Sequence, residues 1–70
     1  MKEFKLRDGE EFIKLGQLLK ATGLVSSGVD AKIVIQDGEV MVNGCVEIQR
    51  GKKIISGDTV TYNGEQIKCL

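Results

Sequence analysis

The apolar residues change their period at Gly38, and this change constrains the fold more than any other feature of the sequence. From Leu15 to Gly38 they recur at helical intervals of three and four positions. After Gly38 they alternate along short runs, and two Asn-Gly dipeptides, at 43–44 and 63–64, are strong signals for two-residue hairpin turns. The sequence therefore predicts an α+β fold, with two helices packed on a small, mostly antiparallel β-sheet.

The first helix is predicted to begin at Leu15 and to end at Gly23. Leu15, Leu18 and Leu19 fall on one face and are expected in the core, and Gly23 suits the end of a helix. The other faces of this helix are expected to carry the polar residues Lys14, Gln17 and Lys20. One apolar face indicates a helix that packs on the rest of the domain.

A second helix is predicted to begin after Ser27, because Ser27 and Asp30 match the Ser-x-x-Asp pattern of a helix start. Gly38 is expected to end it. Val34 and Ile35 repeat at helical spacing as further core residues. The connection over residues 24–27 is short, so the two helices are expected to form a compact hairpin.

The N-terminal segment is predicted to form a short strand or a hairpin. Phe4 and Leu6 alternate with charged residues, and Asp8-Gly9 suits a tight turn. A further turn is expected at Gly57-Asp58, between the two Asn-Gly turns. The remaining alternating runs are strands, which predicts a sheet built largely of hairpins.

The charges balance, with 10 basic and 10 acidic residues and a formal net charge of +0. This balance excludes a protein held to nucleic acid or membranes by bulk charge, although it allows a local basic patch. The chain has no His, no Ser nucleophile motif and no phosphate-binding glycine loop. The acidic pair Glu10-Glu11 is expected to be solvated. We therefore predict that the chain is not an enzyme and has no cofactor, metal site or small-molecule substrate.

Cys45 and Cys69 are the only cysteines. Both lie in alternating runs, so they are expected to be reduced and to fill apolar space rather than to bind zinc. No apolar run has the length of a signal peptide or a membrane span. The sequence therefore predicts a single cytoplasmic domain over residues 1–70, without a membrane partner.

Four segments in a fixed order resemble a known family. They are LGQLLKATG (15–23), SGVDAKIVIQDGEVMVNG (27–44), VEIQRGKKI (46–54) and GDTV (57–60). Together they resemble the αL RNA-binding module of the family named after small-subunit ribosomal protein S-four, with a core motif at about 15–60. The nearest match is to short stand-alone bacterial members, some of which are linked to ribosome maturation. The resemblance implies a small protein that binds structured ribosomal or transfer RNA as a monomer.

In this family the helix pair and the following hairpin present a basic groove to RNA. The resemblance implies that the RNA-binding residues are Lys20, Ser26, Ser27, Lys32, Arg50, Lys52 and Lys53. Each also has a simpler explanation: Ser27 caps a helix, and surface lysines are usually only solvated. Many family members carry Arg where this chain has Gly28, and many are clearly basic.

Two hypotheses follow for the function. In the first, the chain reads the shape and backbone of folded RNA, since it has few aromatic residues on which bases could stack. In the second, the same fold docks a protein through exposed apolar residues such as Val29 or Met41, which the neutral charge and Gly28 would favour.

Overall fold

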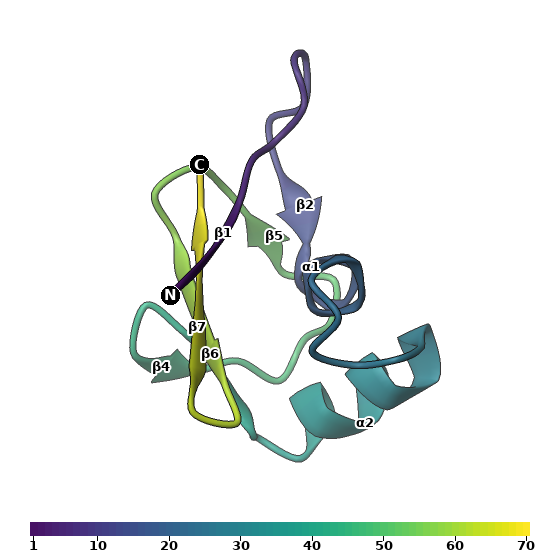
Figure 1. Ribbon diagram of the computed structural model, residues 1–70. Coiled ribbons are helices and arrows are strands. Elements are labelled where there is room, and N and C mark those ends of the chain that lie inside the picture. Colours follow the sequence, from purple (N-terminus) through teal and green to yellow (C-terminus); the bar gives the residue numbers. More distant parts are fainter.

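Two helices lie to one side of a five-stranded sheet in the computed structural model, which describes all residues from 1 to 70 (Figure 1). The elements follow one another as β1 (Lys2–Phe4), β2 (Ile13–Lys14), α1 (Leu15–Ala21), α2 (Gly28–Gln36), β3 (Val40–Val42), β4 (Cys45–Val46), β5 (Lys53–Ile54), β6 (Thr59–Tyr62) and β7 (Glu65–Cys69). The predicted α+β class is confirmed, and β2 leads directly into α1.

The strands of the larger sheet are ordered β1-β7-β6-β3-β4, and β2 pairs with β5 in a separate two-stranded sheet. Every pair is antiparallel except β1 with β7. Both Asn-Gly turns have positive φ at both residues, 52° and 82° at 43–44 and 52° and 77° at 63–64. This is the pattern of a type I′ turn, which matches the twist of a hairpin. Both predicted hairpins are confirmed.

Of the two alternatives predicted for the N-terminal segment, the short strand forms as β1 and the hairpin does not. A turn does form at Asp8-Gly9, where Gly9 has φ of 88°, but the strands on either side of it belong to different sheets. Lys2 pairs with Ile67 of β7 in parallel, and Ile13 pairs with Ile54 of β5. A local turn signal cannot show this, because the partners are distant strands whose free edges arise only in the folded chain.

The helix ends follow their sequence signals. Gly23 and Gly38, just past the two helices, have φ of 77° and 78°. At the start of α2, the Asp30 N–H donates to Ser27 Oγ (3.2 Å). The Asp30 carboxylate does not complete the reciprocal half of the capping box, because it accepts from Ser26 Oγ instead (2.6 Å). The connection between the helices is 22–27, two residues longer than expected, and its Val25 is buried.

Twelve apolar residues form one buried cluster shared by both helices and both sheets. Its members are Leu15, Leu18, Leu19, Val25, Ala31, Ile35, Val40, Val42, Ile54, Val60, Ile67 and Cys69. Val34 is partly buried and packs against this cluster. No helix is long and apolar enough to cross a membrane.

The two cysteines differ in environment. Cys69 is fully buried, as predicted, and burial, with a smaller contribution from the nearby Asp58 carboxylate, raises the pKa of its thiol. Cys45 is exposed, so the prediction that it fills apolar space is wrong. It lies in β4, an edge strand of only two residues that no helix covers. Met41, expected to be exposed, is half-buried in β3 between two partner strands.

Candidate nucleic-acid interface

The loop at residues 50–52 is fixed to the start of α1 by two backbone hydrogen bonds. The Leu15 N–H donates to the Lys52 carbonyl oxygen (2.9 Å), and the Gly16 N–H donates to the Arg50 carbonyl oxygen (3.0 Å). The first N–H groups of a helix have no acceptor within the helix. The carbonyl groups of this loop accept from two of them. Pairing of β2 with β5 continues the same attachment. Arg50 is thereby held beside α1.

Gly16 lies where α1, α2 and this loop approach one another. A Cβ atom at this position would lie 3.5 Å from the Arg50 Cβ and 3.8 Å from the Ala31 Cβ, both ordinary van der Waals distances. The position would therefore accept Ala without moving its neighbours. A small residue here allows the loop to pack directly on the helix pair.

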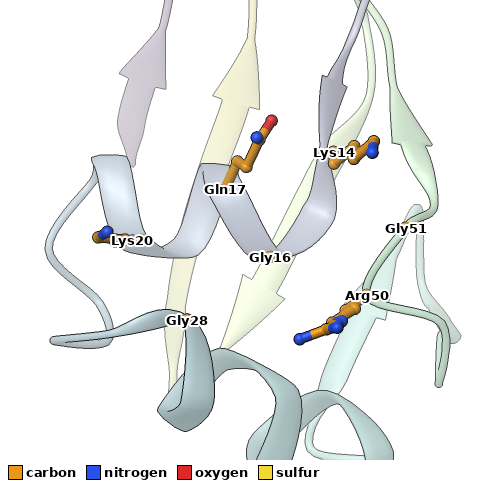
Figure 2. Close-up of a pocket in the computed structure, with 7 residues that line it drawn as sticks. All are labelled: Lys14, Gly16, Gln17, Lys20, Gly28, Arg50 and Gly51. Carbon is orange, nitrogen blue, oxygen red and sulfur yellow. The ribbon is translucent and has the colours of Figure 1, made fainter.

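An open groove runs between α1, the start of α2 and the loop. Its volume is about 400 Å³, and it is lined by Lys14, Gly16, Gln17, Lys20, Gly28, Arg50 and Gly51. We call it the α1–α2 groove. Every charged residue in its lining is basic, none is acidic, and none of the lining side chains is hydrophobic. Figure 2 shows Arg50 extending from the loop into the space between α1 and the start of α2.

The start of α2 borders this groove, and there the helix dipole is opposed by the Asp30 carboxylate in the first turn. Gly28 is the first residue of α2 and lines the groove, so the positive end of the helix dipole lies at its edge. Gly28 is exposed, and a Cβ atom there would meet nothing within 4 Å. Backbone N–H groups at a helix start are well suited to bind phosphate, and an anion can approach Gly28 closely.

Two of the residues predicted to bind RNA, Lys20 and Arg50, lie together in the α1–α2 groove. Lys14 and Gln17 also line it, although sequence analysis placed them only on the outer faces of a helix. These two residues and Lys20 follow one another at intervals of three, which keeps them on one broad side of α1. That spacing is the signal that could have identified them.

The basic residues at 50–53 do not form one patch. Arg50 faces the α1–α2 groove, whereas Lys52 and Lys53 line a second hollow beside β3 and β4. The Lys53 Nζ lies 4.9 Å from the centre of the Phe12 ring, a cation–π contact that positions this side chain. The segment therefore presents positive charge to two separate places.

Lys32, Ser26 and Ser27 line neither hollow. Lys32 is exposed one helical turn after Gly28, so it extends the same face of α2 beyond the groove. Ser26 and Ser27 are engaged with Asp30 at the helix start. The simpler explanation of Ser27, a helix cap, is what the structure shows.

This arrangement has the order of motifs and the fold that the sequence resemblance implied. A family model described as the S4 domain matches residues 4–69. The chain belongs to the S4 domain family. The match confirms the resemblance found in the sequence and runs from the last residue of β1 to the end of β7.

Relatives within this family are of similar length. YbcJ of Escherichia coli, named as a proposed RNA-binding protein, is 41% identical over 58 residues, or 83% of each chain. RlbA of Bacillus subtilis, named as a proposed ribosome maturation protein, is 41% identical over 54 residues, covering 77% of this chain and 76% of RlbA. The two names refer to RNA binding and to ribosome maturation.

A solved structure shares the fold. The solution structure of YbcJ matches with a TM-score of 0.73 and 37% identity, covering all of this chain and 87% of that one. That structure is described as revealing an αL motif involved in RNA binding. The predicted two-helix αL motif packed on a β-sheet is thus confirmed for this S4 domain.

Proposed function

We propose that this S4 domain binds structured RNA, and that the RNA backbone lies in the α1–α2 groove. The observation that carries the proposal is the lining of the groove: Lys14, Lys20 and Arg50 are its only charged residues. The chain as a whole has a net charge of +0, so this concentration of one sign is local. Phosphate groups are the anions that such a surface attracts most strongly in nucleic acids.

The geometry favours the backbone of folded RNA over the bases of a single strand. Bases of single-stranded RNA are usually held by aromatic stacking, and no aromatic residue lines the groove. The fork of the Arg50 guanidinium can instead bind phosphate oxygens in pairs. The exposed backbone at Gly28 offers a second phosphate contact, and Lys32 extends this face of α2 by one turn.

The names of the relatives indicate which RNA to test first. YbcJ is named for RNA binding and RlbA for ribosome maturation. We infer that ribosomal RNA or an assembling ribosomal subunit in the cytoplasm is the partner, bound by a single copy of this chain. Crosslinking in cells followed by sequencing of the bound RNA would identify it.

A charge-matched pair of variants tests the groove. In Lys20→Gln with Arg50→Gln, two cations leave the groove, and the affinity for folded ribosomal RNA fragments should fall about 10-fold or more. In Lys5→Gln with Arg7→Gln, the net charge changes equally, but both residues are exposed in the N-terminal segment outside the groove. That control should bind nearly as the original chain does in a fluorescence anisotropy titration.

Equal losses in the two double variants would show that only net charge matters, and the groove would then not be the binding site. Absence of binding to every folded fragment, with circular dichroism showing intact folds, would overturn RNA binding itself. A comparison with polyuridylate of equal length checks the preference for structured RNA.

The protein-docking alternative is supported by one observation on α2. Val29 and Ile33 are one turn apart, and their side chains are 68% and 51% exposed. A partner recovered by affinity capture that persists after nuclease treatment, and is lost in Val29→Ser, would favour this function. Loss of every partner on nuclease treatment would favour RNA.

A further inference from the structure

The second hollow differs from the α1–α2 groove in the charge and in the apolar content of its lining. It has a volume of about 310 Å³ and is lined by Val42, Asn43, Cys45, Val46, Glu47, Lys52, Lys53, Ile55 and Asp58. Two of these residues are basic and two are acidic, so the formal charge of the lining cancels. Its walls include aliphatic side chains, whereas the groove has none.

The carboxylates in this hollow are largely occupied by the chain itself. Asp58 accepts from Asn43 Nδ2 and from the Ile55 N–H, both at 2.9 Å. Glu47 accepts from the Gln49 N–H at 3.1 Å through one oxygen, Oε2. The other oxygen, Oε1, makes no hydrogen bond within the chain, so it can accept one from a ligand. The two carboxylates therefore hold the loops in place, and Glu47 Oε1 is left to accept a hydrogen bond from a neutral ligand.

The aliphatic part of the lining is unusually open to solvent. Val46 and Ile55 are 60% and 52% exposed, and both border the hollow. Large apolar side chains exposed around a concave surface with a few polar groups are typical of a ligand site. A flat, neutral ligand with an apolar face and hydrogen-bonding edges matches this lining, and a nucleobase is such a ligand.

The two hollows lie on either side of one short segment. Arg50 and Gly51 line the α1–α2 groove, and Lys52 and Lys53, which follow at once, line the second hollow. The lining of the second hollow thus begins one residue after that of the groove, so an RNA that follows this segment out of the groove meets the second hollow next. Backbone contacts position a protein on nucleic acid, whereas contacts with bases supply the selectivity.

We propose that the second hollow receives one unpaired, extruded nucleobase of the same RNA, so that the chain prefers a helix interrupted by a bulge. This inference rests on the proposed function. The base lies against Val46 and Ile55, its edge donates to Glu47, and Lys52 or Lys53 contacts the adjacent phosphate. Bases in perfectly paired helices cannot enter.

The test compares two RNA hairpins that differ by a single unpaired nucleotide in the stem. The bulged hairpin should bind about 5-fold more tightly than the fully paired one, because the base covers exposed apolar surface of Val46 and Ile55. Ile55→Ser should remove this preference while leaving the affinity for the paired hairpin unchanged. Ile33→Ser is the matched control, since Ile33 is 51% exposed but lies on α2 away from the hollow.

Cys45 provides a second readout in the unmodified chain. Its exposed thiol lines the hollow, whereas Cys69 is fully buried, so iodoacetamide should alkylate only Cys45 in the folded protein. Saturation with the bulged hairpin should slow this reaction several-fold more than saturation with the paired hairpin.

The outcomes separate the two proposals. If both hairpins bind equally tightly and protect Cys45 equally, the second hollow does not receive a base, and RNA binding in the groove still stands. If neither hairpin nor any ribosomal fragment binds, the proposed function itself fails. A preference for the bulge that persists in Ile55→Ser would also overturn the assignment of this hollow.

Discussion

Asn43 connects two turns that are far apart in the sequence. It occupies the left-handed region, with φ of 52°, in the turn between β3 and β4. Its side chain also donates to Asp58 (2.9 Å) and accepts from the Thr59 N–H (2.8 Å). The sequence predicted only the turn. Asn63 has the same φ in the other Asn-Gly turn but makes no such side-chain hydrogen bonds.

The two asparagines therefore form a matched pair for mutation. Asn43→Gly keeps a backbone suited to positive φ but loses both side-chain hydrogen bonds, and should lower the free energy of unfolding by about 1–2 kcal/mol. Asn63→Gly should change it by less than about 0.5 kcal/mol. Urea denaturation followed by circular dichroism measures both. Equal effects would show that the side-chain bonds of Asn43 contribute nothing to stability.

At the scale of elements, α2 was predictable because its signals are local. Ser27 caps its start, and Gly38 lies just past its end with the positive φ that such a position favours. The predicted role of Ser27 in binding RNA is open to a direct test, because a cap and a phosphate contact have different consequences when the hydroxyl is removed.

Ser27→Ala should lower the free energy of unfolding by about 1 kcal/mol, since the Asp30 N–H loses its acceptor. Ser26→Ala removes only an exposed bond between side chains and should cost less than about 0.5 kcal/mol. Thermal denaturation gives the ranking. RNA affinity, titrated well below the melting temperature, should be unchanged in both, and a selective loss in Ser27→Ala would show that Ser27 contacts phosphate.

Elements whose position depends on distant partners were not predictable in this way. The Asp8-Gly9 turn forms, yet the strands around it pair with β7 and β5, which only the completed sheets offer as partners. The groove could not be predicted in full for the same reason. Lys20 and Arg50 were identified from their charge and family pattern, but that they meet in one groove follows only from the hydrogen bonds that hold the loop at 50–52 to the start of α1.

At the scale of the whole molecule, a net charge of +0 conceals an uneven distribution. The α1–α2 groove carries three cations and no carboxylate, so the acidic residues all lie elsewhere. When RNA binds, only the cations in the groove displace counterions from the RNA phosphates. If all three contact phosphates, affinity should fall by about 20- to 40-fold between about 50 and 200 mM salt. A neutral protein can therefore bind RNA, with modest affinity.

The charge of the groove can be changed by a substitution at Gly28. Its Cβ direction is open, and its φ is not in the left-handed region, so a side chain fits without strain. Gly28→Arg places a fourth cation at the groove, where many family members carry one. We expect about 5-fold tighter binding of folded ribosomal RNA fragments and a log–log salt slope steeper by about one.

Gly28→Ala is the control for this prediction, because it also replaces glycine in a helix but adds no charge. It should raise the free energy of unfolding by up to about 1 kcal/mol and leave the salt slope unchanged. The salt slope is the decisive measurement, since it counts phosphate contacts independently of stability. If Gly28→Arg bound more tightly with the slope of the original chain, the added arginine would not contact the backbone. The start of α2 would then lie outside the path of the RNA, and the groove would be reduced to α1 and the loop at 50–52.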